Sequence, residues 1–420
     1  MIKLNFGLRN GEKKLNILFI HSCYINQFTL LHKYFQETNI ANSLFLTSEQ
    51  EVNWYRANGT QFPKNLLTYA PDGDIGQNTY YYISTVERSA RHSLHILYAC
   101  KKILETHKID LIVAHGYFGA PHMLFDEIDV PIVTYIEFPS FRHHQWDPKY
   151  PPHDGQRYND KYNEMLYYYA AMKSALVITP SLYAKNMFPA KMQGNIIAQM
   201  EGFDPEEIKF NNPYLLAFKK EPGCIYVGFS ASGLTSEKGF EQFIIISKRL
   251  SELNTKIRYV LLGDPKGTSY CYENSFVANN FGIDKTFKDY LFSKYEVNES
   301  LYICTGKLDM PRLSTAIHNM DFFLYPLQFG SANWGLYEIL LRGKIIVASN
   351  RCFLPEVITD GQNGFLLDYD DIEGWANLCN QIANNLDDYK NIGYNAAKSG
   401  EAFHIENIAK QYVDIFNNIT

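Results

Sequence analysis

The residues best suited to chemistry lie between positions 321 and 364. A polar loop, residues 328–333, follows a short apolar run and leads into a helical pattern at 336–341 that carries Glu338 in its first turn. Free N–H groups and the dipole at a helix N-terminus attract phosphate. A carboxylate there can also accept hydrogen bonds from two vicinal hydroxyls, as a ribose offers. Together these features indicate a nucleotide site. The alternative is that Glu338 only complements the helix dipole.

Strands and turns must position that loop. The apolar runs at 322–325 and 345–348 have the length of buried strands. Gly343 is placed to end the intervening helix, and Pro355 with Glu356 opens another short one. The segment therefore predicts a strand–loop–helix–strand unit of a parallel sheet.

The stretch YEILLRGKIIVASNRCFLPEVITDGQNGFLLD resembles the donor-binding segment of retaining family 4 glycosyltransferases. The resemblance implies the GT-B fold, an α/β architecture of two doubly wound parallel-sheet domains that face a cleft. It also implies a nucleotide-sugar donor, UDP-, GDP- or dTDP-linked, and no cofactor or metal. Glu338 falls on the carboxylate that binds the donor ribose. Many members carry a second glutamate where this chain has Gly330, which leaves open a carboxylate contact to the donor sugar.

The N-terminal half resembles one branch of the same family. The stretch ILFIHSCYINQF corresponds to ILFVHxxFPGQF, with Asn26 in place of glycine. Asparagine tolerates a left-handed conformation better than most residues, so the turn is expected to persist. His115 follows an apolar run at 109–114 and matches a histidine beside the donor sugar, although taken alone it reads as a structural residue. Glu137 matches a loop on the acceptor side.

The C-terminal half supplies the expected charge for a diphosphate. Lys238 and Gly239 match the end of the family's VGRxxxxKG pattern, and Phe229 stands at the arginine position. Lys238 then acts alone, or Arg312 or Arg342 replaces the missing cation. The alternative is that Lys238 is an ordinary solvated lysine.

These comparisons predict three groups of site residues. The catalytic group is His115, Lys238 and Glu338. The acceptor-side group is Glu137, Arg142 and Trp146, where the tryptophan offers a surface on which a sugar ring can stack. The donor-binding group is Asn26, Gln27, Gly228, Lys238, Gly263, Asp264, Lys307, Leu308, Gly330, Ser331, Ala332, Asn333, Trp334, Gly335 and Glu338.

Composition excludes several other classes of protein. The chain has 420 residues, 46% hydrophobic and 20% charged, with a net charge of −6, which argues against a nucleic-acid partner. Its seven cysteines are scattered singly, which favours a reducing cytosol over a disulfide framework. No apolar stretch approaches the roughly 18 residues of a spanning helix. We expect a cytoplasmic protein, at most peripheral to the inner face of the cell membrane.

We therefore predict an N-terminal acceptor-side domain at 1–205, a linker at 206–223, a donor domain at 224–400 and a final helix at 401–420 that crosses back. The expected activity is transfer of a hexosyl or deoxyhexosyl unit to a glycan, lipid-linked or protein acceptor, with retention of configuration, in bacterial surface polysaccharide or glycoconjugate assembly. Two alternatives stay open. One is a catalytically weak nucleotide-binding partner protein with this fold, and the other is a phosphorylase- or epimerase-like enzyme.

Overall fold

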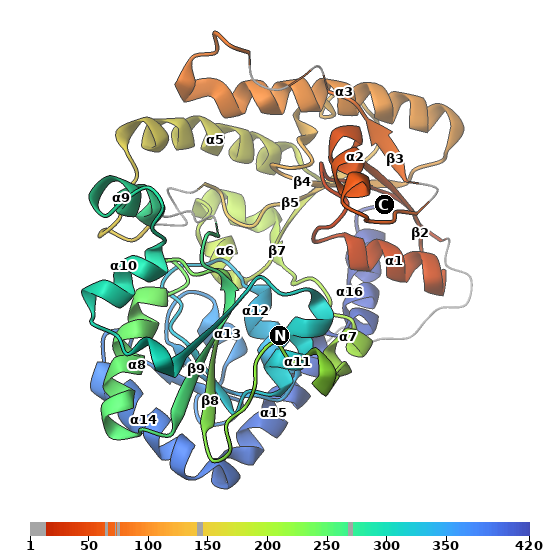
Figure 1. Ribbon diagram of the computed structural model, residues 1–420. Coiled ribbons are helices and arrows are strands. Elements are labelled where there is room, and N and C mark those ends of the chain that lie inside the picture. Colours follow the sequence, from red (N-terminus) through yellow and green to blue (C-terminus); the bar gives the residue numbers. More distant parts are fainter. Residues whose placement is uncertain (1–13, 64–65, 72, 74–75, 141–145, 268–271) are drawn as a thin grey trace.

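The computed structural model describes residues 14–63, 66–71, 73, 76–140, 146–267 and 272–420. Within these residues the strands form two sheets, one of seven strands in the order β3-β2-β1-β4-β5-β6-β7 and one of six in the order β10-β9-β8-β11-β12-β13 (Figure 1). All neighbouring strands run parallel. This confirms the predicted fold of two doubly wound parallel sheets.

The strands are β1 (Asn16–Ile20), β2 (Asn42–Ser48), β3 (Leu67–Tyr69), β4 (Leu111–His115), β5 (Ile132–Tyr135), β6 (Leu176–Thr179), β7 (Ile196–Ala198), β8 (Ile225–Gly233), β9 (Ile257–Asp264), β10 (Tyr302–Gly306), β11 (Phe322–Tyr325), β12 (Ile345–Ser349) and β13 (Phe365–Leu367). The helices are α1 (Thr29–Thr38), α2 (Glu49–Ala57), α3 (Ser84–Thr106), α5 (Asp154–Lys173), α6 (Leu182–Asn186), α7 (Pro205–Lys209), α8 (Phe240–Leu253), α9 (Glu273–Asn280), α10 (Phe287–Lys294), α11 (Met310–His318), α12 (Trp334–Leu341), α13 (Leu354–Val357), α14 (Ile372–Asn384), α15 (Lys390–Gly400) and α16 (Ile405–Asn417).

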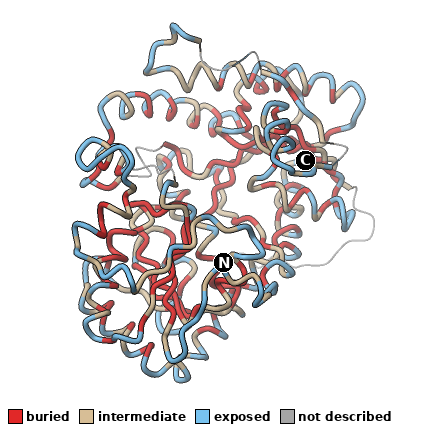
Figure 2. The backbone as a smooth tube through the Cα atoms, in the orientation of Figure 1, coloured by how far each residue is buried: buried red, intermediate tan, exposed pale blue. Residues whose placement is uncertain are grey.

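Both faces of each sheet are covered, so the central strands are buried on both sides, whereas the edge strands β3, β10 and β13 are partly exposed (Figure 2). Successive side chains of β1 point to opposite faces, as the pleat requires. Ile17 and Phe19 pack with α1 and α16, whereas Leu18 and Ile20 pack with α3 and α5. In the second sheet, β8 divides in the same way between a core with α8 and α14 and a core with α11 and α12. Near-continuous apolar strands are the expected sequence signature of this arrangement.

Two segments tie the halves of the chain together. Helix α16 follows the second sheet in sequence but packs against α1 of the first (Figure 1). In the other direction, Tyr150 is only 2% exposed and packs among Phe276, Phe287 and the core of the second sheet. The Tyr150 hydroxyl donates to Glu241 at 3.2 Å, and the Lys149 ammonium group lies 3.1 Å from the same carboxylate. These contacts fix the two sheets relative to each other across the space between them.

The strand order predicts where a ligand binds. In open parallel sheets, ligands bind beyond the carboxyl ends of the strands, where the strand order reverses. In the first sheet this point lies between β1 and β4, and in the second between β8 and β11. The loops after these strands are therefore the expected binding elements.

Candidate active site

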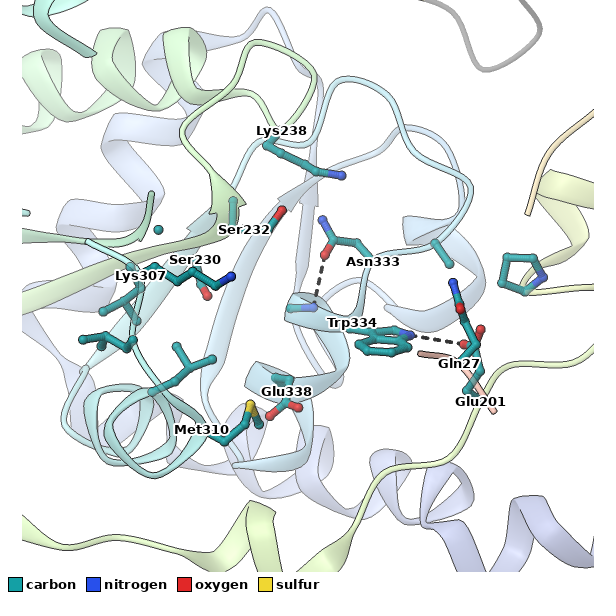
Figure 3. A pocket seen from close by; sticks show the side chains of 18 of the residues that line it. Gln27, Glu201, Ser230, Ser232, Lys238, Lys307, Met310, Asn333, Trp334 and Glu338 are labelled. Atoms are coloured by element: carbon teal, nitrogen blue, oxygen red, sulfur yellow. Dashed lines mark hydrogen bonds between the residues drawn. The ribbon is translucent and has the colours of Figure 1, made fainter. Parts of the chain in front are cut away.

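A cavity of about 440 Å³ lies between the loops of the two sheets (Figure 3). Its size falls in the range of small-molecule sites. Most of its wall comes from the second sheet and α12, and the remainder comes from the first sheet. The lining residues are Gln27, Tyr135, Glu137, Pro180, Glu201, Ser230, Ala231, Ser232, Lys238, Leu262, Gly263, Gly306, Lys307, Leu308, Met310, Leu313, Ser331, Ala332, Asn333, Trp334, Gly335 and Glu338.

The loop before α12 forms the centre of the cavity wall. The Asn333 side chain caps the helix by accepting a hydrogen bond from the Gly335 N–H at 3.1 Å. The helix consequently begins at Trp334, and Glu338 lies in its second turn. The sequence placement of Glu338 in the first turn was therefore wrong, because the asparagine cap starts the helix two residues before the apolar pattern. Glu338 still lines the cavity.

Glu338 is held by an arginine one turn along the helix. The Arg342 guanidinium pairs with the Glu338 carboxylate and also donates to Ser314 Oγ and to the Glu207 carbonyl oxygen. The Arg342 side chain is fully buried, whereas that of Glu338 is 14% exposed. Arg342 thus fixes the orientation of the Glu338 carboxylate, and the part of this carboxylate that Arg342 does not contact lines the cavity.

Lys238 approaches the cavity from the turn between β8 and α8. Its side chain is 16% exposed, and its ammonium group lies 3.4 Å from the Glu237 carboxylate. The next residue, Gly239, has a φ of 78°, and a Cβ atom there would lie 1.5 Å from the Pro326 carbonyl oxygen. Only glycine allows this close approach of the β8 turn to the loop after β11. The glycine therefore brings Lys238 over Asn333 (Figure 3).

Strand β8 continues four residues beyond Phe229, to Gly233. Phe229 is 2% exposed and packs against Phe240 and Phe243, so its ring faces the core and does not line the cavity. Ser230, Ala231 and Ser232 line the cavity instead.

Neither arginine considered as a replacement cation lines the cavity. The Arg342 side chain is fully buried and pairs with Glu338, and Arg312 pairs with Asp309 at the protein surface. Among the described residues, the lysines that line the cavity are Lys238 and Lys307.

The first sheet contributes a wall of acidic and aromatic side chains. Gln27 Nε2 donates to Glu137 Oε1 at 2.6 Å. Burial raises the pKa of the Glu137 carboxyl, while Lys238 acts in the opposite direction. Glu201 accepts hydrogen bonds from the Tyr135 hydroxyl and, at 3.3 Å, from the Trp334 indole N–H. Burial raises the pKa of Glu201 to about 7.

His115 does not line the cavity. It is 3% exposed and packs against the rings of His21, Phe118 and Tyr135. Its Nδ1 accepts the N–H groups of Tyr117 and Phe118, each at 3.2 Å, which places the proton of the neutral ring on Nε2. Burial lowers the pKa of His115 to about 3, so the ring is neutral at physiological pH. Its link to the cavity runs through Tyr135.

Several other expected donor residues lie away from the cavity. Asn26 is not left-handed; its Oδ1 accepts the Phe28 N–H at 2.7 Å, which forms a turn into α1. The expected turn therefore persists, but without the left-handed conformation at Asn26. Gly228 lies within β8 and packs against the Phe323 ring of β11. Asp264, Gly330 and Trp146 are likewise outside the lining, and Arg142 lies outside the described residues.

Comparison with known protein families decides the family of the chain. Residues 41–208 match the family model described as the glycosyl transferase family 4 group. Residues 218–399 match the model of glycosyl transferases group 1. The chain belongs to glycosyltransferase family 4. The curated proteins compared include none that matches it in sequence.

Solved structures agree with this assignment at the level of the fold. Sucrose-phosphate synthase from Thermosynechococcus elongatus aligns with a TM-score of 0.72 at 13% identity, over 97% of this chain and 99% of that chain. A glycosyltransferase from Rickettsia africae aligns with a TM-score of 0.68 at 13% identity, over 97% and 99%. HepE from Anabaena, in complex with UDP and glucose, aligns with a TM-score of 0.65 at 16% identity, over 96% and 100%.

Family 4 membership makes the chain a nucleotide-sugar-dependent glycosyltransferase of a retaining family. The cavity of this glycosyltransferase brings together Gln27, Glu137, Lys238, Gly263, Lys307, Leu308, Glu338 and residues 331–335 from the predicted set. The sequence comparison missed Tyr135, Glu201 and the three residues at 230–232. Glu201 had a weak signal, since it stands in the EGFD turn at the end of the N-terminal half.

Proposed function

We propose that this glycosyltransferase moves a hexosyl or deoxyhexosyl unit from a nucleotide-sugar to a glycan, lipid-linked or protein acceptor with retention of configuration. The observation that carries the proposal is the convergence of Lys238, Glu338 and the N-terminus of α12 on one cavity between the two sheets. Cation, carboxylate and helix terminus are the three groups that a diphosphate-linked ribose requires.

The cavity suggests an orientation for the donor. Leu308, Met310 and Leu313 form an apolar part of the wall suited to a nucleobase. Glu338 follows and would accept the ribose hydroxyls. The diphosphate would lie between Lys238 and the N–H groups at the start of α12, where the helix dipole favours negative charge. The sugar would then face the wall formed by the first sheet.

The reaction needs stabilisation of the departing diphosphate. As the bond from the anomeric carbon to the diphosphate oxygen breaks, negative charge grows on that oxygen. Lys238 would offset this charge, and preorganised contacts of this kind are among the largest contributions to catalysis. The leaving phosphate would accept the proton of the acceptor hydroxyl, which then attacks the same face of the sugar. Glu137, Arg142 and Trp146 remain the proposed acceptor-side residues.

Hydrolysis of nucleotide-sugars without an acceptor tests the proposal. UDP-glucose is the first donor to try, because HepE was solved with UDP and glucose. Slow release of UDP and free sugar supports the transferase. Tight binding without turnover would instead support the nucleotide-binding partner protein, for which Gly330 provides the specific observation, since this position offers no carboxylate.

Substitution of Glu338 is expected to weaken donor binding. Loss of a charge-assisted hydrogen bond to ribose should cost about 1.5–3 kcal/mol. Because Glu338→Ala also leaves Arg342 without its partner carboxylate, Glu338→Gln is the better variant: it keeps an oxygen that accepts from Arg342. Calorimetric titration with UDP, GDP and dTDP measures the effect. Unchanged affinity in both variants would refute a ribose contact.

His115→Ala is expected to lower turnover while affinity for the free nucleoside diphosphate stays nearly intact. The histidine packs on Tyr135, whose hydroxyl reaches the cavity wall at Glu201, on the side of the cavity where we place the sugar. Steady-state kinetics and calorimetry on the same preparation separate the two quantities. An equal fall in both would show that His115 does not act at the sugar end of the cavity.

Activity is expected to survive an excess of EDTA. Metal-dependent glycosyltransferases hold a divalent ion with a DxD pair, and this sequence has that spacing at Asp368-Tyr369-Asp370 and at Asp72-Gly73-Asp74. Asp368 and Asp370 are not among the residues that line the cavity, and Asp72 and Asp74 lie outside the described residues. Lys238 and the α12 N-terminus would supply the positive charge. Loss of activity in EDTA, followed by recovery with magnesium or manganese, would overturn this mechanism.

Two further parts of the proposal concern the setting of the enzyme. We propose a cytoplasmic enzyme of bacterial surface polysaccharide or glycoconjugate assembly, with domain boundaries at 205 and 223. Among the described residues, the helices include none with both the length and the apolar character needed to span a bilayer.

A further inference from the structure

Trp334 lines the cavity and keeps much of its indole exposed. This residue opens α12 and is 46% exposed, although its neighbours Leu336 and Tyr337 are buried. In Figure 3 the indole stands beside Gln27 and Glu201, at the end of the cavity opposite Lys307. An exposed aromatic face is costly to keep in water. A ligand with one apolar face would cover it.

Glu201 holds the indole from the other half of the chain. It is 6% exposed; the Tyr135 hydroxyl donates to one of its carboxylate oxygens and the Trp334 indole N–H to the other. An ionised carboxylate has about four lone-pair sites. Glu201 lines the cavity, so a bound ligand can offer the further donors. Burial raises the pKa of Glu201 to about 7, and it also strengthens any hydrogen bond that a ligand donates to this carboxylate.

The neighbouring groups have the same chemical character. Glu137 lines the same wall and accepts from Gln27 at 2.6 Å. Two carboxylates at one end of a cavity attract hydroxyl donors, and in their ionised form, which Glu201 takes above its raised pKa of about 7, they repel a third anion. The cationic side chains that line the cavity within the described residues, Lys238 and Lys307, both come from the second sheet.

We propose that Trp334 and Glu201 form the subsite for the donor's sugar ring, and that this subsite selects an uncharged hexose over a uronic acid. The C–H face of the ring would stack on the indole, and ring hydroxyls would donate to the Glu201 carboxylate. The inference rests on the proposed function, because it places the sugar beyond a diphosphate held by Lys238. Since Trp334 and Glu201 belong to different halves of the chain, a bound sugar would also bridge the two sheets.

The test compares three ligands by calorimetric titration: UDP, UDP-glucose and UDP-glucuronic acid. If nucleotide screening selects guanosine, GDP, GDP-mannose and GDP-mannuronic acid take their places. The variants are Glu201→Gln, Trp334→Phe and Trp334→Leu, with Trp54→Leu as a control because Trp54 is an exposed tryptophan of α2.

Wild-type protein and Trp54→Leu should bind UDP-glucose at least about tenfold more tightly than UDP-glucuronic acid. Glu201→Gln should lose about tenfold in affinity for UDP-glucose, the size of a charge-assisted hydrogen bond, while its affinity for UDP changes less than about twofold. The same variant should also show a smaller difference in affinity between UDP-glucose and UDP-glucuronic acid than the wild type does. Trp334→Leu should lose affinity for UDP-glucose alone, and Trp334→Phe should retain more of it.

Equal losses for UDP and UDP-glucose would overturn the subsite, because a merely structural role affects both ligands alike. No loss for either would overturn it as well. If Glu201→Gln does not fold, the two Trp334 variants decide the matter alone. Failure of the wild-type protein to bind any nucleoside diphosphate would instead overturn the proposed function itself.

Discussion

Lys238→Ala is expected to reduce turnover about a hundredfold or more, the usual consequence of removing one preorganised contact to a developing anion. Lys238 is the cation that β8 and Gly239 bring over the α12 N-terminus. Its role is confined to the diphosphate, so the folded state should remain. Steady-state kinetics measures this loss of turnover. The substrate is the nucleotide-sugar that the hydrolysis assay identifies as the donor.

A matched control is Lys398→Ala, which removes an exposed lysine from α15. It should retain wild-type turnover. Lys238→Arg keeps the positive charge but changes the geometry of the hydrogen-bonding group. It should therefore have more activity than Lys238→Ala and less than the wild type. A fully active Lys238→Ala protein would show that another cation, with Lys307 the first candidate, neutralises the diphosphate.

Arg342→Met is expected to lower the free energy of unfolding by about 3–5 kcal/mol, because removing one partner leaves a desolvated carboxylate without compensation. The variant also removes the guanidinium donor from Ser314 Oγ and one of the donors to the Glu207 carbonyl, which still accepts from the Ser314 hydroxyl. Nucleotide affinity should fall in parallel, since Arg342 orients Glu338. Urea denaturation measures the first effect, and titration with the nucleoside diphosphate measures the second.

Arg312→Met provides the comparison. Arg312 lies on α11 and pairs with Asp309 at 3.1 Å, with more than half of each side chain exposed. Exposed pairs contribute about 0–1 kcal/mol, so this variant should be nearly as stable as the wild type. If the two arginine variants lost equal stability, the buried network around Glu338 would not be the source of the effect.

The fold could be predicted because its signals are local. Apolar runs of strand length alternate with helical patterns, and β11 has the predicted bounds at 322–325. The ends of elements were harder to predict. Asn333 starts α12 before the apolar pattern begins, and β8 continues through the polar residues Ser230 and Ser232. Caps and polar strand ends carry little hydrophobic periodicity, so a pattern-based prediction misses them.

The walls of the cavity were predicted less completely, since they depend on contacts between distant residues. The hydrogen bond from Trp334 to Glu201 joins residues 133 positions apart. His115 illustrates a different limit. A strand buried on both faces gives no sequence signal for the direction of its last side chain, and this ring points into the core beside Tyr135.

The most direct test is a crystal structure of the chain with the nucleoside diphosphate that binds most tightly. We predict hydrogen-bond distances, about 2.6–3.2 Å, between the ribose hydroxyls and the Glu338 carboxylate and between the β-phosphate and Lys238 Nζ. A nucleotide bound outside this cavity, or bound within it with its ribose away from Glu338, would contradict the account.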